Sequence, residues 1–355
     1  HEHTYATGGS KTIKFWGNTT GYYNAGGVGQ TITFGSSSDD AGDPFTPELV
    51  AGISGSLGAI FPARDGVYPS FQNTFAGCVN LTSIPENLFG YMSDGNYVGV
   101  TGPASFVRTF YGCTGLTSIP ENLFGRTVNG IYYGVSGAVY GMFDETFRYC
   151  SSITSIPGNL FSRTINGINY GVSGAVGQMF WGTFANTGIT SIPANLFSGV
   201  SGSAFGMFIY TFAETNITSI PEGLFNGVSG SADSEFWGTF ALCTSLTSLP
   251  NVLFAGISNS NNGNTVSVTG SWMFGGMFYG DTALSGYVPK TLFANMVDGS
   301  DGTLMTTIYE TPIFGNTNLA TSCDSYGLTE YTTGFEPYWN GKVSCAPAAV
   351  FSCEN

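Results

Sequence analysis

Side chains that could carry acid–base chemistry near neutral pH are scarce in this chain, which has only two histidines, His1 and His3. Because both lie at the start of the sequence, a Ser-His-Asp or Cys-His arrangement is not expected elsewhere. A free terminal amine followed by histidine at the third position can chelate Cu²⁺ or Ni²⁺, and His1 and His3 fit that pattern if His1 is the terminus. We favour the alternative, a start that binds no metal.

Carboxylates gather in two segments, with Asp39, Asp40 and Asp43 in "SSSDDAGDP" and Asp298 and Asp301 in "VDGSDGT". Close carboxylates on glycine-rich loops can hold Ca²⁺, but neither segment matches an EF-hand loop, so we favour solvated turns. No pair of acids stands out as the two carboxylates of a glycoside hydrolase. We therefore expect no catalytic activity and no cofactor.

The seven cysteines fall into two sets. Four occupy the same position of a repeated phrase, without the Cys-x-x-Cys spacing of zinc sites, and are expected to be reduced, buried thiols. Three more lie beyond the last repeat. The first set is Cys78, Cys113, Cys150 and Cys243, and the second is Cys323, Cys345 and Cys353.

The repeated phrase is the dominant feature of the sequence: "GCTGLTSIPENLF" (Gly112–Phe124) nearly copies "GCVNLTSIPENLF" (Gly77–Phe89). A phrase that recurs at a near-fixed period indicates a repeat architecture rather than a catalytic motif. A degenerate copy opens at Met277 and a remnant at Ile313, and start-to-start spacings range from 28 to 38 residues. The six clear copies open at Thr74, Thr109, Thr146, Thr183, Thr211 and Thr239.

Within one copy the apolar spacing predicts a short helix and then a short strand. In "GMFDETFRYC" the apolar residues Met142, Phe143 and Phe147 fall at helical intervals. The following Thr/Ser/Ile stretch suits a strand, which Pro157 ends. No copy can bury its apolar face alone, so the copies are expected to stack.

Inserts after Leu-Phe account for the longer repeats. They include Arg126–Gly137 ("RTVNGIYYGVSG") and Arg163–Gly174 ("RTINGINYGVSG"), in which Asn-Gly is flanked by β-branched or aromatic residues. Asn-Gly in this setting predicts a β-hairpin. Inserts that are present in some repeats only are expected at the periphery.

The pattern "TFxxCxxLTSIP" resembles the BspA-like class of leucine-rich repeats in bacterial surface proteins. The resemblance implies an α/β solenoid, a leucine-rich-repeat right-handed superhelix with irregular β-hairpin inserts. It divides the chain into an N-terminal β cap (1–44), a solenoid (45–322) and a C-terminal cap or tail (323–355). Thr187 and Thr215 depart from the pattern where other copies have Cys.

Both ends of the chain resemble parts of related surface proteins. His3, Tyr5, Gly9 and Thr12–Phe15 resemble the closing strands of a PKD-type Ig-like domain, which implies a partial sheet that caps the first repeat. The tail "GLTEYTTGFEPYWNGKVSCAP" resembles tails that close with a cysteine pair, which implies a Cys323–Cys345 disulfide and leaves Cys353 free or paired between chains.

Composition excludes several functions. The chain has nine Lys and Arg residues and a net charge of −14. Clustered cations needed to grip phosphate or an anionic membrane are therefore missing, and no nucleic-acid partner is expected. No apolar run is long enough for a transmembrane helix. The polar start implies that any leader has been removed or left out, and a surface rich in Ser, Thr, Asn and Gly suits a secreted or cell-surface protein.

A Thr-Ser pair recurs in every clear copy. It either supports the repeat structurally or forms a concave, uncharged recognition strip for glycan or protein. We expect a non-catalytic adhesion or recognition protein; the alternative is a structural subunit of an extracellular filament or matrix that assembles head to tail with copies of itself. The pairs are Thr82-Ser83, Thr117-Ser118, Thr154-Ser155, Thr190-Ser191, Thr218-Ser219 and Thr247-Ser248.

Overall fold

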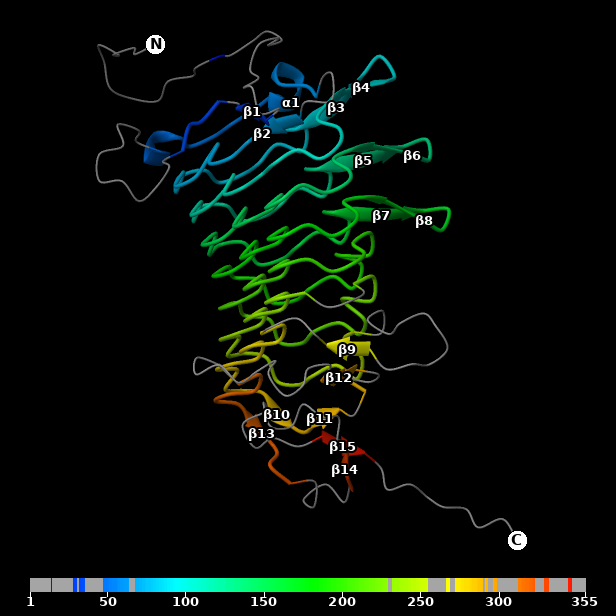
Figure 1. The fold of residues 1–355 in the computed structure, drawn as a ribbon. Coiled ribbons are helices and arrows are strands. Elements are labelled where there is room, and N and C mark those ends of the chain that lie inside the picture. The colour runs from blue at the N-terminus through cyan, green and yellow to red at the C-terminus, as the bar shows by residue number, and fades with distance from the viewer. Residues whose placement is uncertain are drawn as a thin grey trace.

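The computed structural model describes most of the repeat region and isolated parts of both ends. The described residues are 14, 28–30, 32–35, 47–63, 68–228, 232–254, 266–268, 272–289, 291–292, 296–298, 312–322, 329–331 and 344–346. Figure 1 shows the repeats as successive layers that run from the N-terminal to the C-terminal end of the molecule.

Backbone hydrogen bonds join each layer to the next. Phe106 N donates to Met142 O at 2.8 Å, and Phe143 N donates to Met179 O at 2.9 Å. Isolated parallel bridges continue the pairing on another side of the layers, for example Gly102 with Val135 and Gly137 with Val172. The layers thus satisfy much of one another's backbone, as buried polar groups require.

Regular strands are short. Three antiparallel hairpins project from one side of the layers (Figure 1): β3 (Gly90–Ser93) with β4 (Asn96–Gly99), β5 (Gly125–Val128) with β6 (Ile131–Gly134), and β7 (Ser162–Ile165) with β8 (Ile168–Gly171). Near the N-terminal end, β1 (Val28–Gln30) pairs in parallel with β2 (Tyr68–Ser70).

The C-terminal part holds the remaining small sheets. Two are parallel pairs, β9 (Val266–Val268) with β12 (Met296–Asp298) and β10 (Ser285–Gly286) with β13 (Asn318–Leu319). In a third, β15 (Ser344–Ala346) lies between β11 (Val288–Pro289) and β14 (Thr329–Tyr331).

The predicted α/β leucine-rich-repeat solenoid, with its right-handed superhelix, is wrong. Among the described residues, helix is confined to η1 (Pro47–Leu49) and α1 (Leu57–Ile60), which have three and four residues. The described strands form separate small sheets, namely three antiparallel pairs, three parallel pairs and one mixed sheet of three strands, rather than one sheet with a helix in each repeat. The structure is therefore a strand-rich fold of small sheets and turns.

The segment predicted to be helical is a run of overlapping tight turns. Thr146 N donates to Phe143 O three residues back at 3.2 Å, whereas Phe147 N donates to Thr183 O of the next layer at 2.9 Å. Glu145 and Tyr149 have φ of 50° and 63°, a left-handed conformation that an α-helix excludes. Because left-handed residues recur every four positions, Phe143 and Phe147 lie on the same side of the backbone. Their spacing in the sequence is therefore the same as that of residues on one face of a helix.

Prediction of the hairpin inserts is confirmed for both Asn-Gly segments. Asn129 and Gly130 have φ of 50° and 76°, and Asn166 and Gly167 have φ of 52° and 79°. Two consecutive left-handed residues are what a two-residue hairpin turn requires. A third hairpin, β3–β4, turns at Asp94 and was not predicted.

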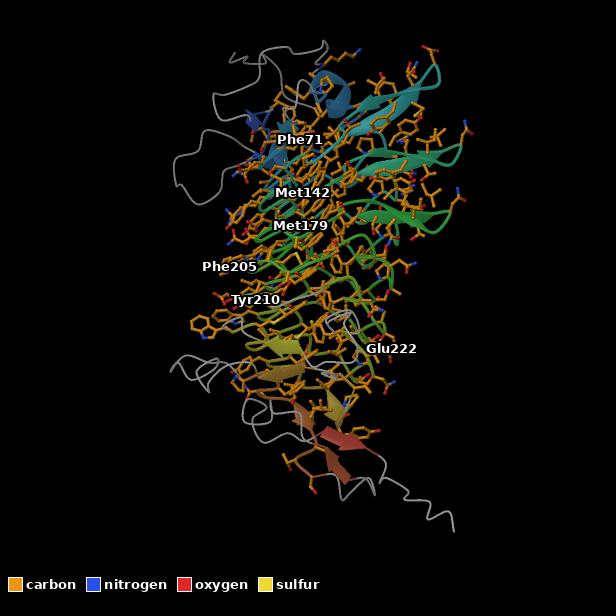
Figure 2. All side chains as sticks on the ribbon, turned by 45° about the vertical axis from the view of Figure 1, so that its right-hand side comes forward. Phe71, Met142, Met179, Phe205, Tyr210 and Glu222 are labelled. Atoms are coloured by element: carbon orange, nitrogen blue, oxygen red, sulfur yellow. The ribbon has the colours of Figure 1, made fainter. Side chains whose placement is uncertain are left out.

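Phenylalanine rings fill the core in three columns. Neighbours within a column are stacked, as Phe143 is on Phe180 at 5.7 Å between centroids, and rings of the third column wedge between the other two. Methionine occupies the position before the first column, and Figure 2 shows Met142 and Met179 within the layers. The columns comprise Phe71, Phe106, Phe143, Phe180, Phe208, Phe236 and Phe274; Phe75, Phe110, Phe147, Phe184, Phe212, Phe240, Phe278 and Phe314; and Phe89, Phe124, Phe161, Phe197, Phe225 and Phe254.

The four repeat cysteines are buried and free, as predicted. Three of the four thiols also bond to the adjacent layer: Cys113 Sγ donates to Phe75 O at 3.1 Å, Cys150 Sγ donates to Phe110 O at 3.0 Å, and Cys243 Sγ donates to Phe212 O at 3.1 Å. Burial raises the pKa of Cys150 to about 12. The threonine that opens each copy acts in the same way, because Thr146 Oγ1 donates to Phe106 O at 2.9 Å.

Candidate binding surface

All six Thr-Ser pairs are exposed, while the Leu or Ile before each pair is buried. These pairs, from Thr82-Ser83 to Thr247-Ser248, are called the Thr-Ser strip. Thr190 N donates to Thr154 O at 3.2 Å, and Thr218 N donates to Thr190 O at 3.2 Å. Backbone contacts of this kind set the spacing between neighbouring layers at about 4.8 Å.

The Thr-Ser-Ile segments were predicted to be strands, and this is wrong. The described backbone there forms no strand. The reason is that single bonds, rather than a ladder, join the neighbouring threonines from Thr154 to Thr247: Thr247 N donates to Thr218 O at 3.3 Å. Thr247 Oγ1 donates to the same carbonyl, also at 3.3 Å.

A cluster of charges lies among the turns of two layers. Glu145 binds Arg108 and Arg148 through both carboxylate oxygens. The Arg148 guanidinium also lies 5.0 Å from the Tyr149 ring centroid. Burial raises the pKa of the neighbouring Asp144 to about 7, and the Glu145 charge adds to this shift. Because the two arginines are paired within the chain, this cluster stabilises the turns rather than offering free cations to a ligand.

Two further carboxyl groups are buried, and within the described part of the chain neither forms an ion pair with a cation. Glu235 stands in the methionine position of its layer and accepts a hydrogen bond from Ser203 Oγ at 2.7 Å. Burial raises its pKa to about 8. Asp281 occupies the cysteine position and accepts from Cys243 N at 2.8 Å, and burial raises its pKa to about 9. In both cases burial favours the neutral form of the carboxyl group, which is unlike the ionised form that a nucleophile or base needs.

A cleft lies beside the hairpins and was not found by sequence reasoning. It has a volume of about 520 Å³, and its lining has two parts, called its walls: Tyr133 and Tyr170 belong to strands β6 and β8, and Ser136 and Ser173 belong to the segments that follow these strands. The sequence signal for this cleft was the aromatic residues of the inserts, which we interpreted only as residues that favour a β-hairpin.

Several predicted residues lie outside the described part of the chain. These are His1, His3, Cys323, Cys353 and the carboxylates at 39, 40, 43 and 301. Cys345 lies in β15, where only the backbone is described. The N-terminal cap (1–44) and tail (323–355) are described only in short pieces. Within the described residues, no group of three or more His, Cys, Asp or Glu could hold a metal ion.

One expectation about the membrane can be compared with the structure. In the part of the chain that is described, no helix has the length and apolar character needed to cross a bilayer. Comparison with known proteins finds no match among family models, curated proteins or solved structures. The resemblance to BspA-like repeats and to a PKD-type domain therefore stays a prediction.

Proposed function

We propose that the chain is a non-catalytic, secreted or cell-surface recognition protein whose Thr-Ser strip contacts a glycan or a protein. The single observation that supports this most is the exposure of every pair in the strip over a continuous buried core. Hydroxyl groups both donate and accept hydrogen bonds, so a regular array of them suits an uncharged polar partner.

The rigidity of the backbone beneath the Thr-Ser strip also supports this proposal. The residues on either side of a pair are buried, as are Ile153 and Ile156 beside Thr154 and Ser155, except that Leu249 after the last pair is partly buried, so the backbone beneath the hydroxyls is held by packing. A preorganised surface loses less conformational entropy when it binds. The scarcity of cations argues against an anionic partner, because electrostatic attraction of an anion needs a positive field that nine Lys and Arg residues in a chain of net charge −14 cannot provide.

The proposal is tested by placing charges on the strip. Thr154→Lys with Thr190→Lys puts two ammonium groups on adjacent layers, while Thr127→Lys makes the same change at an exposed threonine of β5. Binding of the intact chain to printed glycans and to cultured cells is expected to fall with the double variant and to persist with the control. Equal binding by all three proteins, or turnover of a substrate by the unmodified chain, would contradict the proposal.

Head-to-tail assembly is the alternative that the sequence raised. It involves residues 1–40 of one copy and the region after Cys323 of the next, most of which lies outside the described residues. Light scattering of the full chain, compared with a chain that lacks the first forty residues, separates the two ideas. Growth of open chains only in the full protein would favour the filament subunit.

A further inference from the structure

The first two hairpins share a packing arrangement that the third replaces. Tyr97 and Tyr132 occupy the same register position, and each hydroxyl donates to a backbone carbonyl three residues later, at 3.2 and 2.8 Å. Each ring lies over a glycine of the partner strand. A Cβ at Gly90 or Gly125 would come within 2.0 or 2.2 Å of the tyrosine oxygen.

The third hairpin has lost both partners of this arrangement. Its register places Asn169 where the tyrosine stands and Ser162 where the glycine stands. Ser162 is buried, and its Oγ lies 3.0 Å from Ser198 Oγ. Asn169 Oδ1 accepts from Thr164 Oγ1 at 2.6 Å, and Asn169 Nδ2 donates to Ser198 O at 2.8 Å. A fixed amide therefore stands at the cleft in place of a third ring.

The cleft beside β6 and β8 has two walls of different chemistry. The residue after Asn169 is Tyr170, whose ring stacks on Tyr132 at 6.2 Å, whereas Tyr133 stacks on Tyr97 at 5.6 Å. These rings are set in place by stacking on other rings. Tyr170 keeps 37% of its surface exposed, and among the described residues of the next two layers no β-hairpin follows β8.

The second wall, called the hydroxyl wall, carries one hydroxyl group in each layer. Thr101, Ser136 and Ser173 each come two residues after a glycine that ends a hairpin strand, and all three line the cleft. The backbone holds them in register, because Ser136 N donates to Gly102 O at 3.1 Å and Ser173 N donates to Gly137 O at 3.2 Å.

We propose that this cleft binds a neutral carbohydrate, with a pyranose ring against Tyr170 and Tyr133 and its hydroxyls bonded to the hydroxyl wall formed by Thr101, Ser136 and Ser173. The lining contains no Asp, Glu, Lys or Arg, so nothing there would recognise a charged ligand. An aromatic face attracts the positively polarised C–H edge of a sugar, and Ser, Thr and Asn supply both donors and acceptors. A volume of about 520 Å³ suits a small-ligand site.

The cleft shares no residue with the Thr-Ser strip, so this proposal goes beyond the proposed function and can fail separately. A nucleobase would also stack on tyrosine, but its phosphates would have no cation to meet in this lining. A peptide would not offer the hydroxyl wall the hydroxyl groups that a sugar ring carries. A sugar has an apolar C–H face that can pack on the tyrosines and hydroxyl groups that can bond to the hydroxyl wall, so it matches both walls.

The test uses the full chain on a printed array of neutral oligosaccharides of glucose, mannose, xylose and N-acetylglucosamine, together with sulfated and sialylated glycans. Calorimetry with the strongest neutral binder then compares variants. Tyr170→Ala is expected to weaken binding about tenfold, because the stacking face is lost. Tyr170→Phe keeps the ring and is expected to bind within about twofold of the unmodified chain.

Two further variants keep the result interpretable. Ser173→Leu removes an exposed hydroxyl from the other wall and is expected to weaken binding, whereas Tyr140→Ala removes a ring that is 62% exposed outside the cleft and should leave binding unchanged. Unfolding midpoints show whether each variant folds. Binding of acidic glycans alone, no binding of any neutral glycan, or full binding by folded Tyr170→Ala would overturn the proposal. The strip variant Thr154→Lys with Thr190→Lys should leave binding of this neutral glycan intact, while the loss of other glycans or of cell binding by that variant reports on the strip alone.

Discussion

Glu235 is a buried acid in a position that methionine fills in other layers, and Glu235→Met is expected to stabilise the protein in a pH-dependent way. Met142, Met179, Met207 and Met273 occupy the equivalent sites and are fully or almost fully buried. Glu235 is fully buried too, and among the described residues its Oε1 has no hydrogen-bond partner. Methionine has a similar length and no charge to desolvate, so it should fit the column without strain.

The size of the effect follows from the pKa of Glu235. Burial raises the pKa of this carboxyl from 4.5 to about 8, so the folded state holds a proton that the unfolded state has released at neutral pH. The folded state is therefore favoured in acid, and stability is lost as pH rises from about 4.5 towards 8. At pH 7 the loss is about 3 kcal/mol, at about 1.4 kcal/mol per pH unit.

Urea unfolding followed by tryptophan fluorescence between pH 4 and pH 8 measures this difference. The gain in unfolding free energy from Glu235→Met should be small at pH 4 and larger by about 3 kcal/mol at pH 7. Glu222→Gln is the matched control (Figure 2 labels Glu222), because this exposed carboxylate accepts from Asn251 N at 2.9 Å and Val252 N at 2.7 Å.

Although some burial raises it, the pKa of Glu222 is lowered on balance by these backbone hydrogen bonds. Its contribution to stability is present above the unfolded pKa and is lost as pH falls, the opposite direction to Glu235. If the difference between Glu235→Met and the unmodified chain stays constant from pH 4 to pH 8, Glu235 is not held protonated and the reasoning is refuted.

Other changes test the core and the buried groups. Phe161→Ala removes a ring that is 1% exposed and contacts five other phenylalanines, so urea unfolding should show a loss of about 3–5 kcal/mol. Phe205→Ala, at a ring that is half exposed, should cost less than about 1 kcal/mol. Cys150 should resist a thiol reagent until the chain is denatured, and Cys150→Ala should cost about 1–2 kcal/mol; fast native labelling would contradict its burial. Asp281→Asn should keep the bond from Cys243 N and stabilise the chain increasingly as pH rises from 4 towards 9, because burial raises the pKa of Asp281 to about 9; unfolding curves that shift equally at all pH values would argue against this.

Residues that repeat along the chain were predicted more successfully than the elements they form. Burial of Cys150 followed from its column in the repeat, and the Asn129-Gly130 hairpin followed from two residues that tolerate left-handed φ. The helix at Met142–Cys150 failed because apolar residues four apart are equally compatible with overlapping turns. Glu145 and Tyr149 carry the left-handed φ there, and neither residue type signals it.

Of the two candidate surfaces, the Thr-Ser strip could be predicted from the sequence and the cleft could not. Exposure of Thr154 and Ser155 was implied by the buried isoleucines on either side, which the sequence alone shows. The cleft at Tyr170 was not foreseeable, because its walls come from hairpins and loops of different repeats. The substitution of Asn169 for tyrosine is visible in the sequence, but its meaning depends on which residues face each other in the hairpins.

The sequence by itself determined the period of the chain, the residues that face inward and the turns of two hairpins, because these depend on local spacing and on the φ preferences of Asn and Gly. Tertiary structure decided how the backbone between those residues is bonded. In isolation Phe147 N could bond within a helix, but the next layer offers Thr183 O at 2.9 Å. Stacked phenylalanine rings hold the layers in register at that distance, and the turn conformation prevails because it lets both neighbouring layers satisfy their amides.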